Sequence, residues 1–374
     1  MTEPRKIVLI LGNGFDLDLG LKTSYQDFWD SMYCPKDYPA PLIRHLNEKW
    51  PKNREGVKWY DLENELFAYY RELQNIHPIN DVITLKEREF LQKLPEGHSV
   101  RGYYKEYEAE IQSLIKKGIL IADSSFGAYI QVPYLKDLKE HSIWRDRRAF
   151  ALIKERLCQY LRKCQENVFM GSTPASVVLG ALDYARRNGD FLNIFTFNYT
   201  SLPARFNIIP DDVLHYVHGD CDQGNIIIGT IDDGSYSQDY DFLQKSFDPD
   251  YNPPAITEAL RDADDVVFFG HSIGSNDRQY FKAFFKQQTA YETAKGKRIT
   301  IFTRDEHSVV EIKRSLQQMT DNSLSALYCL NSLQIITTVD IPRNPDNLRC
   351  FLNSFISDTD QVRFIIDGVV RSAN

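Results

Sequence analysis

The segment KIVLILGNGFD, residues 6–16, contains the pattern that decides the fold. Residues 6–11 form a short apolar run that breaks at Gly12-Asn13-Gly14, which is typical of a buried strand entering a tight turn. Glycines at such a turn let the backbone approach a phosphate, and the N-terminus of a following helix favours an anion. The segment therefore indicates the first strand of an α/β sheet, followed by either an anion-binding turn or a plain turn.

Strand and helix patterns alternate again from about residue 172 onward. We expect strands at residues 191–196, 213–217, 226–228, 265–269, 298–303 and 333–338, and helices at residues 175–187, 255–261, 277–286 and 306–317. Thr303 and Glu306 have the Thr-x-x-Glu spacing of a capping box at the start of the last of these helices. Strands separated by helices favour a parallel sheet that is covered on both faces.

Residues 25–170 have a helical, strand-poor pattern, so the simplest fold is an α/β, doubly wound parallel sheet interrupted by a large, mostly helical insertion. We expect a discontinuous core of residues 1–24 and 172–340, an insertion of residues 25–171, and a C-terminal extension of residues 341–374 packed on the core. Residues 94–99 are expected to be a connecting loop. Residues 232–254 form an acidic loop that is long enough to be a mobile lid over a site.

Bulk composition excludes several classes of protein. The formal net charge of −8 disfavours general nucleic-acid binding, because proteins that bind phosphate backbones carry a basic excess. No apolar stretch is long enough for a signal peptide or a transmembrane helix, so we expect a soluble cytoplasmic protein without a membrane partner. The six cysteines form no C-x-x-C pair, so we expect free thiols and no metal site.

Polar residues follow the expected strands, where ligands bind in doubly wound sheets. Asn198 can hold a sugar hydroxyl or a water, because its amide is both a donor and an acceptor. His218 can act as a base at neutral pH. Asp16 is a poor neighbour for a phosphate because of its charge, so we expect it to meet hydroxyls or an amide. Each of these residue types also ends strands for structural reasons alone, and we expect a structural role for His215.

The segment Gly270-His271-Ser272-Ile273-Gly274 has two interpretations. It fits a second anion site between a strand and a helix, and it also spells Gly-x-Ser-x-Gly, the nucleophile elbow of α/β-hydrolases. A hydrolase needs an acid and then a histidine later in the chain, and only His307 follows, with Asp305 as its nearby acid. Both lie on the very next strand-helix turn, earlier than in a typical hydrolase. A serine hydrolase is therefore the lesser alternative.

Five motifs together resemble a known family. They are VLILGNGFDLDLGLKTSYQDF, WYDLENEL, FTFNYT, VHGD and FFGHSIGSNDRQYF, within residues 7–281. Their order and spacing are similar to those of the bacteriophage abortive infection AbiH family, which in turn resembles the sirtuin-like NAD-binding superfamily. The residues that match the sirtuin motifs are Gly12, Gly14, Gly20, Leu21, Thr196, Asn198, His218, Gly219, Gly270 and Ser272.

The resemblance implies NAD as the ligand. His218 would then be the base acting on the nicotinamide ribose, Asn198 would hold that ribose or the attacking water, and Asp16 would add electrostatic stabilisation. The resemblance also implies phosphates near the turn at residues 12–15 and near Ser272. The full expected NAD-binding set is Gly12, Asn13, Gly14, Phe15, Thr196, Gly219, Gly270, His271, Ser272 and Thr303.

Departures from the sirtuin pattern favour hydrolysis of NAD over deacetylation. Asp16 stands where sirtuins have a serine, Thr200 stands where they have an aspartate, and residues 22–25 replace their Pro-Asp-Phe-Arg. The zinc cysteines of sirtuins are also absent. The resemblance thus implies an anti-phage protein that cleaves NAD to nicotinamide and ADP-ribose, and the alternative is a non-catalytic sensor of NAD or ADP-ribose. A homo-oligomer or a partner defence protein fits either function.

Overall fold

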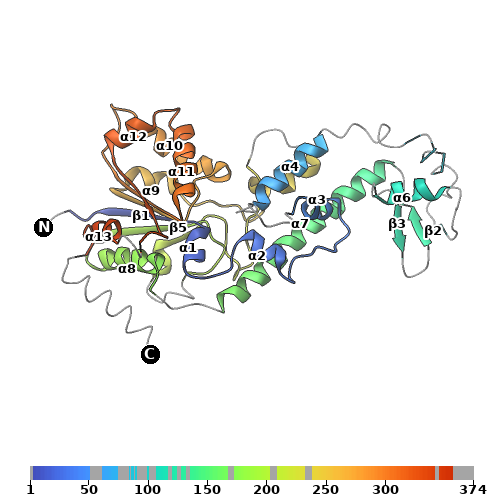
Figure 1. The fold of residues 1–374 in the computed structure, drawn as a ribbon, viewed down its shortest axis with the longest axis horizontal. Coiled ribbons are helices and arrows are strands. Elements are labelled where there is room, and N and C mark those ends of the chain that lie inside the picture. The colour runs from blue at the N-terminus through green and yellow to red at the C-terminus, as the bar shows by residue number, and fades with distance from the viewer. Residues whose placement is uncertain are drawn as a thin grey trace. The chain divides into compact units, whose positions relative to one another are not determined.

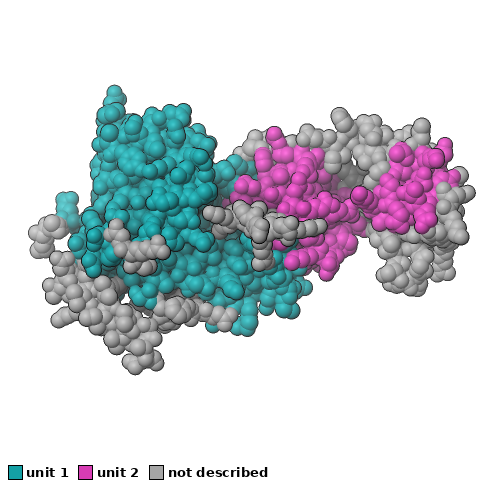
Figure 2. Space-filling view, in the orientation of Figure 1, with its two compact units in different colours: residues 1–34, 154–231, 248–374 teal, residues 35–153, 232–247 magenta. Residues whose placement is uncertain are grey.

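The computed structural model describes residues 3–50, 61–74, 84, 86–87, 89–90, 99–100, 107–116, 120–123, 128–131, 135–166, 172–202, 209–231, 238–341 and 345–356. The chain forms two compact units, one of residues 1–34, 154–231 and 248–374, and the other of residues 35–153 and 232–247 (Figure 2). The chain therefore leaves the first unit and returns to it twice. The second unit includes residues 232–247, which we had not expected to belong with the residues between β1 and β5.

The first unit contains a six-stranded parallel sheet (Figure 1). Its strands are β1 (Lys6–Leu11), β5 (Phe191–Thr196), β6 (Leu214–Tyr216), β7 (Asp265–Phe269), β8 (Arg298–Thr303) and β9 (Ser332–Thr337), in the spatial order β6-β5-β1-β7-β8-β9. Every neighbouring pair is parallel. Numbered in chain order within the sheet, these strands run 3-2-1-4-5-6, the order of Rossmann-like sheets. The predicted α/β class with a parallel sheet is confirmed, and the topology is compatible with a Rossmann-like fold.

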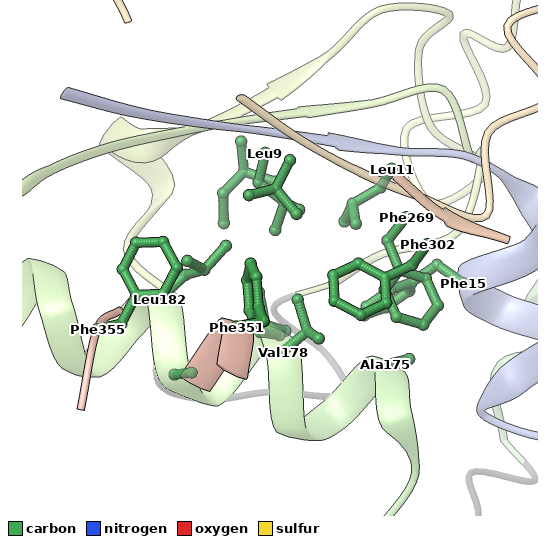
Figure 3. Close-up of a cluster of buried hydrophobic side chains, with 14 of the residues drawn as sticks. Leu9, Leu11, Phe15, Ala175, Val178, Leu182, Phe269, Phe302, Phe351 and Phe355 are labelled. Carbon is green, nitrogen blue, oxygen red and sulfur yellow. The ribbon is translucent and has the colours of Figure 1, made fainter. Parts of the chain in front are cut away.

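Helices cover both faces of this sheet (Figure 1). One face carries α1 (Asn13–Asp18), α8 (Pro174–Arg187) and α13 (Asp346–Leu352), and the other carries α9 (Ile256–Asp262), α10 (Arg278–Gln287), α11 (Glu306–Met319) and α12 (Leu324–Leu330). Leu9 and Leu11 pack into the core on the α8 face (Figure 3), whereas Val8 and Ile10 pack into the core on the α10 face. Burial on both faces explains why the central strands appear in the sequence as continuous apolar runs.

The first unit also contains α2 (Tyr25–Asp30), η3 (Asp211–Val213), η6 (Ser275–Asp277) and the part of α7 (Leu135–Gln165) from residue 154 onward. Two contacts hold the residues that follow β1. Tyr160 in α7 donates a hydrogen bond from its hydroxyl to Lys22 O at 2.7 Å. Ser24 and Asp27 form a capping box at the start of α2. The chain after the glycine turn is therefore held at both of these points.

The second unit contains α3 (Pro41–Lys49), α4 (Leu62–Gln74), α6 (Glu108–Lys116), the first part of α7, and the turns η4 (Gln238–Leu243) and η5 (Lys245–Phe247). It also contains an antiparallel sheet of β2 (Ser99–Val100), β4 (Ala128–Gln131) and β3 (Leu120–Asp123), in that order. The sequence did not predict this sheet, because strands of two to four residues are too short to show a clear alternation. Among the described helices, none combines the length and the apolar character needed to cross a bilayer.

Within the loop predicted at residues 232–254, residues 238–247 are not a free lid. The hydroxyl of Tyr240 donates at 3.2 Å to the fully buried carboxylate of Asp146. Lys245 forms an ion pair with Glu63 at 3.1 Å, and both side chains are at most 9% exposed. These buried polar contacts hold the loop inside the second unit, so the expectation of a mobile lid is wrong for these residues.

Two local predictions are also wrong. Residues 226–228 lie outside the sheet, and their backbone bonds elsewhere, with Ile227 N–H donating to His218 O at 2.8 Å. The capping box is absent, because the N-cap of α11 is Asp305, whose carboxylate accepts from Ser308 N–H at 3.0 Å. The other predicted strands and helices of the first unit agree with the structure to within two residues at each end. Residues 94–98 and 357–374 lie outside the described part of the chain.

Candidate functional site at the carboxyl edge of the sheet

The turn after β1 packs directly against the turn after β7. Gly12 N–H donates to Phe269 O at 3.0 Å, and Gly14 N–H donates to Gly270 O at 2.9 Å. Gly270 has a φ of +63°, and a Cβ atom there would lie 2.3 Å from Phe15 N. Only glycine fits both this left-handed backbone and this contact. The glycines of the two motifs are therefore explained by the close approach of two turns.

These contacts use amides that we had expected to bind a phosphate. Gly14 N–H donates to Gly270 O, and Phe15 N–H donates to Gly12 O at 2.9 Å. The helix that follows, α1, is only six residues long. A phosphate at this edge would therefore depend on other donors, and the exposed hydroxyl of Ser272 is one of them.

Asn198 joins the segment after β5 to the glycine turn. Its Nδ2 donates to Gly12 O at 3.1 Å, and Asn198 as a whole is only 6% exposed. Nearby, Thr200 Oγ1 donates to Asp16 Oδ2 at 2.6 Å, and both residues are buried. Asp16 therefore meets a hydroxyl, as expected from its charge, and this hydroxyl belongs to the protein.

The carboxylate of Asp277 lies between two histidines. Oδ1 is 3.0 Å from His218 Nε2, and Oδ2 is 3.4 Å from His271 Nε2. Each histidine is 4% exposed, and the Asp277 side chain is 18% exposed. His218 comes from the segment after β6, whereas His271 and Asp277 come from the segment after β7. The ends of two strands on opposite sides of β1 therefore meet at one carboxylate.

The turn that carries His271 is strained and is held by its own side chain. Ile273 has a φ of +51°, which a β-branched residue rarely adopts. Its N–H donates to His271 Nδ1 at 2.9 Å. Because Nδ1 accepts this bond, the proton of neutral His271 is on Nε2, which faces Asp277.

An aromatic cluster surrounds the two histidines. The Phe197 ring lies edge-to-face with the rings of His218 and His271, at centroid distances of 5.2 and 4.4 Å. The Tyr280 ring lies 6.0 Å from His218, and its hydroxyl is 3.3 Å from that of Tyr251. Burial raises the pKa of the Tyr280 hydroxyl, which therefore stays protonated at neutral pH. Because Phe197 precedes Asn198, the segments after β5, β6 and β7 form one cluster.

Two further residues near His218 have structural roles. Gly219 has a φ of +70°, and a Cβ atom there would lie 2.1 Å from Asn225 O. His215 Nε2 lies 3.3 Å from Asn193 Oδ1, its ring stacks on Phe195, and burial lowers its pKa. The structural role that we expected for His215 fits these contacts.

The remaining predicted site residues lie at the same edge of the sheet but make separate contacts. Asn13 Oδ1 accepts from Thr23 Oγ1 at 2.6 Å, and Thr196 Oγ1 accepts from Asn198 N–H at 3.1 Å. Thr303 is buried at the end of β8, and its carbonyl accepts from Thr338 N–H at 2.7 Å. These residues position the backbone of the neighbouring turns.

The Gly-x-Ser-x-Gly segment is explained by its packing, without a role for Ser272 as a nucleophile. Gly270 is needed for its packing against Gly14, where a Cβ atom would lie 2.6 Å from the Cα of Gly270. Asp305, the acid that a hydrolase would use, caps α11 through Ser308. His307 is exposed. We therefore favour the interpretation of this segment as part of the histidine cluster.

Asp277 is the site residue that sequence reasoning missed. It is the N-cap residue of α10, a position where aspartate usually satisfies backbone amides. Its side chain makes no cap hydrogen bond and reaches the two histidines instead. In the sequence it appears as an ordinary helix start, so only the fold shows its second partner.

The chain matches the model of a known protein family. A family model described as Bacteriophage abortive infection AbiH matches residues 8–295 of the chain. This range includes Asn198, His218, His271 and Asp277. No curated protein and no solved structure matches the chain.

Proposed function

The chain belongs to the bacteriophage abortive infection AbiH family, and we propose that it hydrolyses NAD to nicotinamide and ADP-ribose at the carboxyl edge of its parallel sheet. One observation carries the proposal. The buried segments that bear Asn198 and His218 meet beside the glycine turn, at the point where the strand order reverses around β1. In sheets of this topology, dinucleotides bind across that point.

The residues fit the chemistry of glycosidic cleavage. The bond between the ribose C1′ and the nicotinamide nitrogen breaks, and its electron pair leaves with neutral nicotinamide. A water oxygen then bonds to C1′, and one of its protons passes to His218 and from there to solvent. Asn198 orients the ribose or this water, and the carboxylate of Asp16 stabilises the positive charge that develops on the ribose.

Burial sets a condition for this reaction. His218 is 4% and Asn198 is 6% exposed, so a ligand reaches them only after neighbouring side chains move. Tyr280 and Tyr251 are the aromatic pair next to His218 that leads toward the surface, where Gln279 Nε2 lies 3.5 Å from the Tyr251 hydroxyl. We infer that displacement of this tyrosine pair admits the nicotinamide ribose and that its return excludes water.

A second function is favoured by the hydrogen bonds of the glycine turn. Gly12, Gly14 and Phe15 donate their amides within the protein, and Asn198 donates to Gly12 O. Because Asn198 is engaged in this bond, it is less available to orient a ribose or a water, which favours a binding module that senses NAD or ADP-ribose without turning it over. Turnover distinguishes this sensor from the hydrolase.

The test measures nicotinamide release and NAD binding in parallel, with and without lysate of phage-infected cells. We expect His218→Ala and Asn198→Ala each to lower turnover roughly 10²- to 10⁴-fold, with NAD binding retained in at least one of them. Ser272→Ala is expected mainly to weaken binding. His307→Ala, at an exposed histidine, is the matched control and should leave turnover unchanged. Binding without release under both conditions supports the sensor. Hydrolysis of an ester substrate that is lost in Ser272→Ala supports a serine hydrolase.

A further inference from the structure

We propose that Asp277 is the positioning residue for His218 and that it makes Nδ1 of His218 the nitrogen that accepts the proton. This inference rests on the proposed function for its catalytic part. Its structural part, the protonation pattern of the two histidines, stands on the geometry alone. The carboxylate of Asp277 is within 3.0 Å of His218 Nε2 and within 3.4 Å of His271 Nε2.

The position of Asp277 in the chain leaves its carboxylate available to the histidines. Asp277 ends the turn η6, which runs directly into α10, and Arg278 N–H already donates to Ser275 O in that turn. The Asp277 backbone has a φ of −117° and a ψ of 7°, and its side chain makes no cap hydrogen bond to α10. The carboxylate faces the histidines instead.

His271 determines which atoms of the cluster carry protons. Its Nδ1 accepts from Ile273 N–H at 2.9 Å, so its Nε2 carries the proton and donates to Asp277 Oδ2. Protonation of Nδ1 would break the bond to Ile273 in a turn whose φ is +51°. In the neutral His271 ring both nitrogens are therefore engaged, Nδ1 by Ile273 N–H and Nε2 by the Asp277 carboxylate.

The same carboxylate fixes the tautomer of His218. An ionised carboxylate only accepts hydrogen bonds, so Nε2 of His218 must donate its proton to Asp277 Oδ1. The lone pair of the neutral ring is consequently on Nδ1. A proton taken up there produces an imidazolium that faces the Asp277 carboxylate, which stabilises its charge in a water-poor site.

The cluster also predicts what Asp277→Asn does. His271 can only donate from Nε2, so it selects the amide oxygen of the new side chain. The amide NH₂ then faces His218 Nε2, which must become an acceptor. The substitution should therefore move the His218 proton from Nε2 to Nδ1 without changing the size of the side chain at position 277.

Nitrogen-15 NMR of histidine-labelled full-length protein tests this directly, with the His218 and His271 signals assigned from His218→Gln and His271→Gln. We expect the Nε2–H tautomer for both histidines in the parent protein, and inversion of His218 alone in Asp277→Asn. Glu292→Gln, which removes a charge at an exposed position, should change neither. An Nδ1–H tautomer of His218 in the parent protein overturns the proposal even if Asp277→Asn does not fold.

Steady-state kinetics of nicotinamide release test the catalytic part of the proposal. Asp277→Asn should lower kcat by roughly 10²-fold or more with KM little changed, as expected for a base held in the wrong tautomer. Asp277→Glu, which keeps the carboxylate, should recover part of this loss. Unchanged kcat in Asp277→Asn overturns the positioning role. If the parent protein releases no nicotinamide, the proposed function fails, whereas the tautomers still decide the structural part.

Discussion

The Nδ2 atom of Asn198 lies 3.1 Å from the carbonyl oxygen of Gly12 and donates a hydrogen bond to it. The bond links two turns that are far apart in the sequence and lie at the ends of neighbouring strands. The bond also gives Asn198 a structural role, because a buried carbonyl oxygen without a hydrogen-bond donor destabilises the folded protein. Asn198 therefore holds the glycine turn in place whether or not a ligand is bound.

Asn198→Asp should destabilise the first unit more than Asn198→Ala does. The carboxylate would place an acceptor against the Gly12 carbonyl, whereas alanine only removes the donor, at a cost of about 1–3 kcal/mol. Thermal unfolding of the two variants measures the difference. Gln317→Ala, at an exposed position of α11, is the control and should match the parent protein. Equal stability of Asn198→Asp and the parent protein would contradict the structural role.

Gly270→Ala should destabilise the protein by about 3 kcal/mol or more. The left-handed backbone costs about 1–2 kcal/mol for alanine, and the added Cβ atom would lie 2.3 Å from Phe15 N, which adds an overpacking cost of about 1–3 kcal/mol. Gly296→Ala is the matched control, because Gly296 has a φ of +65° and a Cβ atom there would make only an ordinary contact, 3.7 Å from Leu330 O. It should cost only about 1–2 kcal/mol. Similar unfolding midpoints for both variants would show that the two turns do not approach each other closely.

Asp146 should make the stability of the second unit depend on pH. Burial raises its pKa from 3.8 to about 6, although three hydrogen-bond donors oppose this shift. Its folded-state pKa is above its unfolded one, so its contribution to stability is complete below about pH 4 and is lost as the pH rises to about 6. The loss amounts to about 3 kcal/mol. Unfolding free energies of the parent protein and of Asp146→Asn should diverge across this range, with the parent protein losing more.

The control for this pH dependence is Asp37→Asn, which removes an exposed carboxylate from the same unit. It should keep the pH profile of the parent protein. Parallel profiles for the parent protein and Asp146→Asn would show that Asp146 titrates normally in the folded state.

The ion pair of Lys245 and Glu63 should anchor residues 238–247. Lys245→Met leaves the Glu63 carboxylate buried beside an apolar side chain, which costs about 3–5 kcal/mol. The double variant Lys245→Met with Glu63→Met should recover most of this loss, because no buried charge remains. Differential scanning calorimetry of Lys245→Met, Glu63→Met and the double variant measures both effects. Additive losses in the double variant would mean that the two side chains act independently.

The sheet could be predicted from the sequence because its central strands are buried on both faces, as the apolar runs at residues 6–11 and 265–269 indicate. The placement of Asn198 and His218 at one edge of the sheet could be predicted because a parallel sheet gathers its strand ends there. Their burial, and the use of the Gly14 and Phe15 amides inside the protein, depend on the approach of a distant turn. No local pattern encodes that approach.

The second unit shows the same limit more strongly. Tyr240 and Lys245 lie in a stretch that is polar enough to be an exposed loop, and they are buried because Asp146 and Glu63 meet them from other segments. Asp277 is similar, because aspartate at a helix start is too common to indicate a histidine partner. Pairings of this kind arise from tertiary structure, so they appear only when the fold is known.

The most direct test of the central claim is hydrolysis of NAD in oxygen-18 water, followed by mass spectrometry of the ADP-ribose. The account predicts that the full-length protein, alone or with lysate of phage-infected cells, forms nicotinamide and ADP-ribose that carries one heavy oxygen atom. It also predicts that His218→Ala slows this formation roughly 10²- to 10⁴-fold, while His307→Ala does not. Unchanged NAD under both conditions, or labelled ADP-ribose formed equally fast by His218→Ala, would contradict the claim.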